Sequence, residues 1–190
     1  MLLQLGSIDH ERRVTRIVSQ LYDLTWPLHG MSRSDRNLLR LAAVVHDVGR
    51  SIDDERHPRE GARMLLQADH LPLSTAERRA LAYLTRYHRG AVPEAGMDRV
   101  LSRRDDHERL RLTLALLRAA DALDSRAIES PRLVFAMRDR RLWITCYLVE
   151  DTPKARKVYS RRKKFRLLEE LLGCRVDVQI ALAEKLKMVA

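Results

Sequence analysis

The chain has 190 residues, of which 45% are hydrophobic and 33% are charged. This length suits one well-buried domain, or a domain with a small appendage, and argues against a multi-domain assembly. No apolar run approaches the roughly 18 residues of a membrane span, and the N-terminal residues do not resemble a signal peptide. We therefore expect a soluble, cytoplasmic protein that has no membrane partner.

The charge of the chain is basic and unevenly distributed. The formal net charge is +10, and residues 151–190 carry 11 basic and 5 acidic side chains. Such a surface raises the local concentration of anionic partners such as nucleotides, polyphosphate or nucleic acid. A solvated, arginine-rich surface explains the same composition, so charge alone does not identify a partner. The two cysteines, Cys146 and Cys174, lie far apart, which argues against a zinc knuckle or a redox pair.

Apolar spacing predicts helices in the N-terminal half of the chain. Residues 9–24 form an amphipathic pattern that ends before Pro27. Ser34 is a candidate cap for a second helix, with Gly49 as the glycine that ends it. Pro58 suits the first turn of a third helix.

The next two helices have clear start signals. Ser74 and Glu77 form a capping-box pattern that opens a helix running to about Arg89. Residues 105–127 begin with acidic side chains and continue as a long apolar pattern, which predicts a long helix.

Beyond Pro131 the sequence changes in character. Residues 132–137 and 141–149 are rich in strand formers and predict a hairpin. A basic helix over residues 154–172 and a short strand over residues 174–180 follow. We therefore expect a mainly α protein with a small C-terminal α+β element of short antiparallel strands and a basic helix.

Polar residues occur where the helical pattern predicts burial. His46 and Asp47 close the apolar stripe of the second helix, and Asp121 continues an apolar line of the long helix. A buried, unpaired carboxylate costs several kcal/mol, so a cation is expected beside it. A divalent metal satisfies histidine and carboxylate ligands together, and bundle helices commonly hold such sites between them. His10, in the first helix, is a further candidate ligand.

The order of these residues resembles the HD superfamily of metal-dependent phosphohydrolases. Its pattern H…HD…D is met in DHERRV, VVHDVG and LLRAADALD, and two further family positions are matched in HPREGA and RYHRG. The resemblance implies a helical bundle over residues 1–130, with residues 131–190 as an extension packed on it. It also implies two divalent metals, with Mn, Fe, Co and Mg as the candidates. The implied ligands are His10, His46, Asp47, His57, His88 and Asp121.

A closer resemblance is to the C-terminal HD domain of the exopolyphosphatase and guanosine pentaphosphatase (Ppx/GppA) family. The segments LYDLTWPLHGM, HDVGRSI, TRYHRGAVP, LLRAADALDSRA and KKFRLLEELLGCRVDV are all similar to it, so the likeness covers nearly the whole chain. In that family, actin-like domains that cleave phosphoanhydrides precede the HD domain. The present sequence starts almost at the HD domain, so the exopolyphosphatase activity does not carry over.

The resemblance implies hydrolysis of a phosphate ester or phosphoanhydride by a metal-activated hydroxide. The substrate classes are a nucleotide, an alarmone or polyphosphate. Asp47 would bridge the metals, and His57 and His88 would bind a metal or contact phosphate. Arg50, beside Gly49, and Arg89, beside His88, are close in sequence to presumed ligands and would neutralise phosphoryl oxygens.

Two other functions remain open at this point. The first is a non-catalytic HD module that binds nucleotide or polyphosphate, or that partners a separate Ppx/GppA-type phosphatase. The second is a nucleic-acid-binding protein, which rests on charge alone and is the least favoured. Residues 154–166 hold eight basic side chains, whose role the sequence leaves open. The sequence also leaves open whether the protein forms a homodimer.

Overall fold

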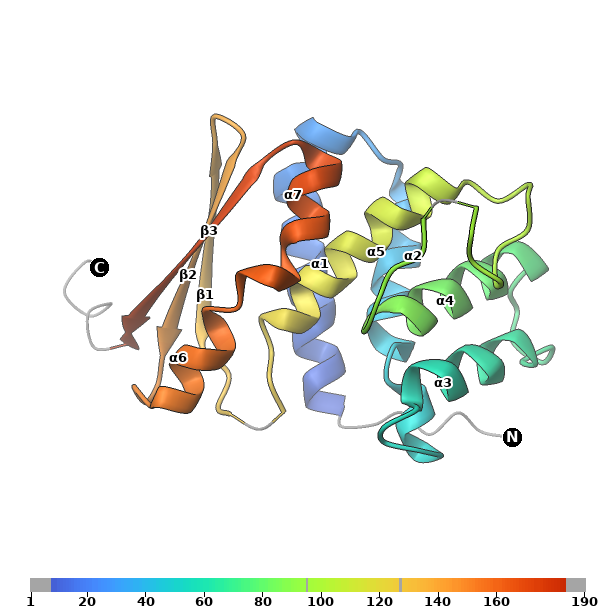
Figure 1. Ribbon diagram of the computed structural model, residues 1–190, viewed down its shortest axis with the longest axis horizontal. Coiled ribbons are helices and arrows are strands. Elements are labelled where there is room, and N and C mark those ends of the chain that lie inside the picture. Colours follow the sequence, from blue (N-terminus) through green and yellow to red (C-terminus); the bar gives the residue numbers. More distant parts are fainter. Residues whose placement is uncertain (1–7, 95, 127, 184–190) are drawn as a thin grey trace.

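A computed structural model describes residues 8–94, 96–126 and 128–183. The protein is mainly helical, with a small three-stranded sheet near its C-terminus, which confirms the predicted fold class (Figure 1). No helix within those ranges is both long enough and apolar enough to cross a membrane. The elements in chain order are α1 (Ile8–His29), α2 (Arg33–Val45), the 3-10 helix η1 (Val48–Ser51), α3 (His57–Leu66), α4 (Thr75–Tyr87), α5 (His107–Ala122), β1 (Arg132–Arg138), β2 (Arg141–Leu148), α6 (Pro153–Tyr159), the 3-10 helix η2 (Arg162–Lys164), α7 (Arg166–Leu172) and β3 (Arg175–Leu182).

The first two helices differ from prediction at their ends. Pro27 lies inside α1, which continues to His29, because a proline in the last turn removes only one backbone hydrogen bond. The cap of α2 is Ser32 and not Ser34. Ser32 and Asp35 form the reciprocal capping box, in which each side chain accepts a hydrogen bond from the other residue's backbone N–H.

Gly49 does not end α2 as predicted. The helix ends at Val45, and Gly49 lies inside η1 without a positive φ. A Cβ atom at Gly49 would lie within 3.0 Å of the His57 carbonyl oxygen and the Gly61 backbone nitrogen. Glycine is therefore required here because η1 and α3 touch backbone to backbone, which places His57 beside the residues that follow α2.

The sheet has the order β1-β2-β3. The predicted hairpin is confirmed: β1 and β2 are antiparallel, and Asp139 and Arg140 form the tight turn with positive φ angles of 50° and 56°. The expectation of antiparallel strands throughout is wrong for β3, which pairs with β2 in parallel. A parallel partner needs a long crossover, and α6, η2 and α7 provide it.

The predicted basic helix over residues 154–172 is broken into these three pieces. Tyr159 and Phe165 are both buried. In one continuous helix, side chains six residues apart would point about 120° apart around the axis, so the two rings would not share one face. The break after Tyr159 lets the chain turn both aromatic rings inward.

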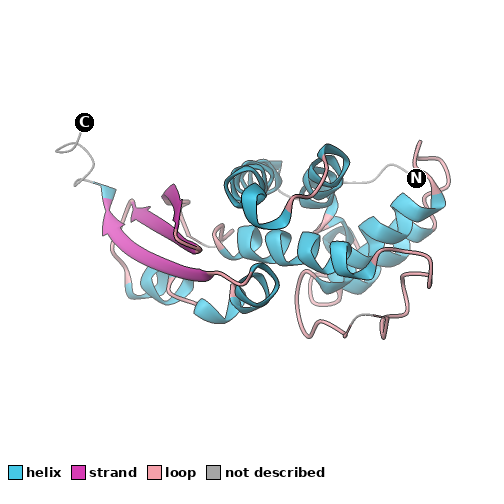
Figure 2. Ribbon diagram, turned by 90° about the horizontal axis from the view of Figure 1, so that it is seen from above, coloured by secondary structure: helices cyan, strands magenta, loops and turns pink. Residues whose placement is uncertain are grey.

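One hydrophobic core runs through the helices and the sheet. Leu114 and Leu117 of α5 belong to the same buried cluster as Ile144 of β2 and Val176 of β3. Figure 1 shows the sheet at one end of the molecule and α3 and α4 at the other, and Figure 2 shows the same sheet from above. The helix α5 lies centrally, so its C-terminal end faces both α1 and the crossover.

Candidate metal centre

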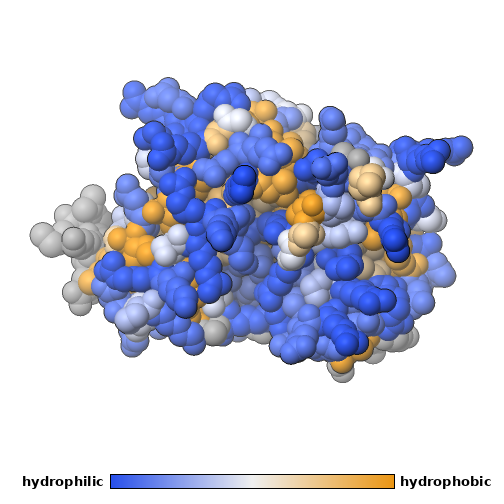
Figure 3. All heavy atoms as spheres, viewed as in Figure 1, coloured by the Kyte–Doolittle hydropathy of each residue, from blue (hydrophilic) through white to orange (hydrophobic). Residues whose placement is uncertain are grey.

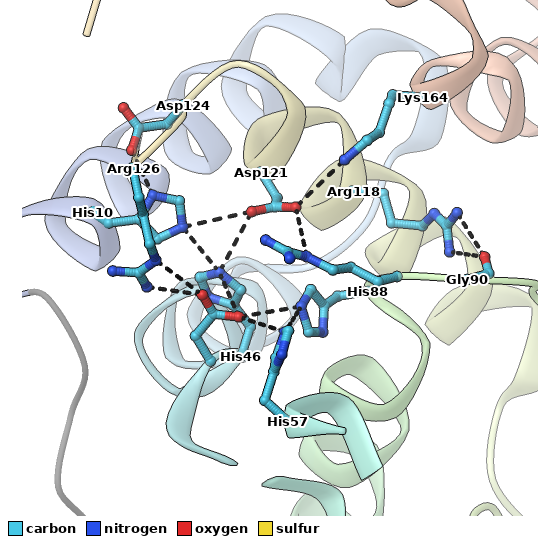
Figure 4. A network of polar contacts seen from close by, with 12 residues as sticks. His10, His46, His57, His88, Gly90, Arg118, Asp121, Asp124, Arg126 and Lys164 are labelled. Atoms are coloured by element: carbon cyan, nitrogen blue, oxygen red, sulfur yellow. Dashed lines mark hydrogen bonds and ion pairs between the residues drawn. The ribbon is translucent and has the colours of Figure 1, made fainter. Parts of the chain in front are cut away.

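The structure brings together all six residues that were predicted as metal ligands (Figure 4). Each comes from the end of a helix or the turn that follows it, and all six are buried. They are His10 in the first turn of α1, His46 and Asp47 after α2, His57 at the start of α3, His88 after α4, and Asp121 near the end of α5.

Backbone carbonyl groups set the tautomer of three of the histidines. In each, Nδ1 lies 2.6 to 2.8 Å from the carbonyl oxygen of the residue three positions earlier. Because a carbonyl oxygen only accepts hydrogen bonds, Nδ1 carries a proton, and in the neutral ring Nε2 presents its lone pair. The pairs are His46 with Ala43, His57 with Asp54, and His88 with Thr85.

On one side of the centre, two of these lone pairs face a carboxylate. The Nε2 atoms of His57 and His88 are 3.3 Å apart, and they lie 3.1 and 3.3 Å from Oδ1 of Asp47. Burial lowers the pKa of His88 to about 4, so this imidazole is neutral near pH 7. Neutral imidazole is the form that binds a metal.

The other side has the same arrangement. The Nε2 atoms of His10 and His46 are 3.3 Å apart, and they lie 3.5 and 3.7 Å from Oδ1 of Asp121. Asp47 belongs to both sides, because Oδ1 of Asp47 is 3.8 Å from Nε2 of His46. The cluster therefore forms two adjacent groups of candidate metal ligands that share the Asp47 carboxylate.

The residues present fit a divalent metal. Oδ1 of Asp47 is buried and has no hydrogen-bond donor within the described part of the chain. Imidazole lone pairs surround this anionic oxygen, an arrangement that is repulsive unless a cation lies among them. In each of the groups His10, His46, Asp47 and Asp47, His57, His88, the candidate ligand atoms lie within 4.8 Å of one another.

Asp124 orients His10, and the sequence analysis missed it. Its Oδ2 lies 2.5 Å from Nδ1 of His10, while Oδ1 accepts hydrogen bonds from Arg13 and Ser130. Burial would raise the pKa of Asp124, but these three partners outweigh burial and lower the pKa, so the carboxylate stays ionised. Only its position three residues after Asp121 hinted at this role.

We expect Asp124→Asn to weaken metal binding about tenfold or more, because a carboxylate behind a ligating histidine fixes the ring and raises its basicity. Isothermal titration of the metal-free protein with Mn²⁺ measures the effect. Glu60→Gln is the control, since Glu60 pairs with Arg63 while the Asp54 carbonyl satisfies Nδ1 of His57. Equal affinities for wild type and Asp124→Asn would contradict this role.

Two arginines hold the second oxygen of Asp47. Arg50, as the sequence indicated, lies at the cluster and donates to Oδ2 of Asp47 over 2.8 Å. Arg126 also donates to Oδ2 over 2.8 Å, and it bridges to Glu11 at 2.7 Å. Arg126 was not predicted: the sequence pattern extended this helix to residue 127, but α5 ends at Ala122, and Arg126 lies in the loop that follows.

Two residues of the cluster, His10 and Asp121, line a cavity of about 310 Å³. Arg89, the other arginine that the sequence indicated, has its Nε 3.7 Å from Oδ2 of Asp121. Lys164 reaches the same oxygen from the crossover, with its Nζ at 3.8 Å. A larger cavity of about 580 Å³ lies between α2 and α4, but no histidine lines it. The smaller cavity therefore combines the cluster with a basic rim.

No curated protein matches the chain. A family model described as Ppx/GppA phosphatase, domain III, matches residues 7–143, which contain all six residues of the cluster. This range covers more than half of the chain, and it agrees with the closer of the two sequence resemblances. The chain belongs to the Ppx/GppA phosphatase family, as its domain III.

Proposed function

We propose that this protein is an HD-type, metal-dependent phosphohydrolase that acts on a phosphate ester or phosphoanhydride. The observation that carries the proposal is the buried Oδ1 of Asp47, which faces histidine Nε2 atoms and has no donor among the described residues. A scaffold that only binds another protein does not need such a costly arrangement. A divalent cation bound among these atoms would remove the repulsion between the carboxylate oxygen and the imidazole lone pairs.

The metal would be held by the six residues of the cluster, with Asp47 shared between two positions. Four imidazoles in the set favour Mn, Fe or Co over Mg, because Mg prefers oxygen ligands. A divalent metal at this place supplies Lewis acidity, which acidifies water and polarises a phosphoryl oxygen.

The residues of the chain itself have separate tasks in this proposal. Arg50 and Arg126 fix the plane of the Asp47 carboxylate through Oδ2 and leave Oδ1 for the metal. Arg89 lines the cavity and provides a forked donor for phosphoryl oxygens, whose charge grows as the bond to the leaving group breaks. Because all six residues of the cluster are buried, they exclude bulk water from the side of the site that faces away from the cavity.

The alternative is a module that binds nucleotide or polyphosphate without hydrolysis, or that assists a separate phosphatase. The family match favours it as the second candidate, because the matched model describes the third domain of a phosphatase. Binding of nucleotide or polyphosphate without hydrolysis does not explain why four histidines share the Asp47 carboxylate. The binding module therefore ranks second.

The test is phosphate release by protein that has been stripped of metal and then reloaded. With Mn²⁺ we expect hydrolysis of p-nitrophenyl phosphate or of a nucleoside triphosphate, and no release after treatment with EDTA. Protein carrying His46→Ala, purified in parallel, controls for contaminating phosphatases. Metal-loaded protein that retains nucleotide or polyphosphate without releasing phosphate would favour the binding module. Binding of nucleic acid without any need for metal would overturn both.

A further inference from the structure

The C-terminal crossover supplies part of the wall of the metal-centre cavity. Arg161, the residue before η2, and Lys164, its last residue, line the cavity together with His10 and Asp121. In Figure 4, Lys164 and Arg126 approach the cluster from opposite sides. The basic segment 154–166 therefore contributes directly to the candidate active site, although the metal ligands all precede residue 122.

The fold holds Lys164 in this position. Its neighbour Phe165 is buried in the core, and the backbone N–H of Phe165 donates to the Arg162 carbonyl to close the η2 turn. The side chain of Lys164 is 35% exposed, so its ammonium group lies at the mouth of the cavity and not in open solvent. Lys163, in the same turn, is exposed and does not line the cavity.

More cations than carboxylates line the cavity, although Arg50 and Arg126 also pair with Asp47 and Glu11, which do not line it. Five cationic side chains line it, and the carboxylates among its lining residues are Asp121 and Asp124. Arg161 has no carboxylate partner among the residues that the structure describes. The cations are Arg50, Arg89, Arg126, Arg161 and Lys164.

The surroundings of the cavity favour a small and highly charged anion. The face that carries η2 and the end of α5 is largely hydrophilic and is hollowed near its centre (Figure 3). A volume of about 310 Å³ accommodates a phosphate with a small attached group, whereas a nucleic-acid strand could contact only the rim. A metal in the cluster would add further positive charge.

We propose that Lys164 and Arg161 bind the oxygens of a terminal, dianionic phosphate group at the mouth of the metal centre. The C-terminal crossover then selects substrates that end in a phosphate over phosphodiesters, which lack the second charge and one of the free oxygens. This inference rests on the proposed function, because it takes the cluster to be loaded with metal.

Inorganic phosphate and dimethyl phosphate, titrated into Mn²⁺-loaded protein by calorimetry, are suitable probes. We expect Lys164→Met to weaken phosphate binding about tenfold, since it removes one charge-assisted contact, and to leave dimethyl phosphate binding nearly unchanged. The Mn²⁺ content should stay at the wild-type value. The double variant of Lys164→Met and Arg161→Met should lose more phosphate affinity than Lys164→Met alone. Lys164→Arg should keep most of the wild-type phosphate affinity.

Lys163→Met is the matched control, because it removes the same charge from the same turn but from an exposed position. If Lys163→Met weakens binding as much as Lys164→Met, bulk charge is the cause and the assignment is wrong. The assignment is also overturned if Lys164→Met binds phosphate as tightly as the wild type or loses its metal. It is overturned as well if the wild type binds no phosphate. Phosphate binding that depends on Lys164 in a protein without hydrolytic activity would instead refute the proposed function and leave this inference standing.

Discussion

Replacing Asp47 with alanine is expected to abolish metal retention and to lower phosphate release by about a thousandfold or more. Asp47 belongs to both groups of candidate ligands, so its loss leaves His57 and His88 without a carboxylate and His10 and His46 with Asp121 as their remaining one. The fold should survive, because Arg50 and Arg126, the arginines released by the change, are both part-exposed and reach water. Elemental analysis and far-ultraviolet circular dichroism of the purified proteins measure the two effects.

Asp54→Ala provides a matched control for this experiment. Asp54 carries the same charge and pairs with the same Arg50, but its side chain is exposed and lies outside the cluster. We expect this variant to keep both its metal and its activity. If Asp47→Ala retains metal or hydrolyses substrate as well as the wild type does, the assignment of the centre is wrong. Absence of metal in the wild type, even after reconstitution, would favour the binding module.

The second large effect is expected at Gly49. Gly49→Ala should lower the free energy of unfolding by about 3 kcal/mol or more, because the added methyl group meets backbone atoms of α3 that cannot move independently. The clash falls on the His57 carbonyl, so the variant should also bind metal more weakly. Urea denaturation of the metal-free protein, followed by titration with Mn²⁺, separates these two effects.

Gly30→Ala is the comparison for this prediction. Gly30 has a φ of +58° but nothing within 4 Å of an added Cβ, so only backbone strain of about 1 kcal/mol is expected. If Gly49→Ala lowers the free energy of unfolding by no more than Gly30→Ala does, η1 and α3 separate easily. The close backbone contact would then not be what positions His57.

The apolar pattern and the family resemblance together were sufficient to select the six residues of the cluster. His46 and Asp47 interrupt an apolar stripe at its end, and Asp121 is a charge on the apolar face of α5. The family resemblance added His57 and His88, and the structure places both against Asp47. Their adjacency is observed, whereas metal binding stays a prediction.

The residues that support the cluster could not be selected in the same way. Arg126 and Lys164 lie outside regular α-helix, and their long side chains reach groups that are distant in the chain. Arginine and lysine are so abundant here that a basic residue carries little information. The parallel placement of β3 depends on how the crossover packs, and strand composition gives no sign of it.

The contact between α1 and α5 has a consequence for how the protein matures. His10 and Asp124 meet across 114 positions of the chain, a separation that makes loop closure slow and entropically costly. A nascent chain that ends before α5 already contains His10, His46, Asp47, His57 and His88, but it lacks Asp121 and the helix against which α1 packs. If the cluster binds metal as proposed, tight capture requires the completed fold, and metal uptake during synthesis would mark the moment at which the ends of the helical bundle have closed.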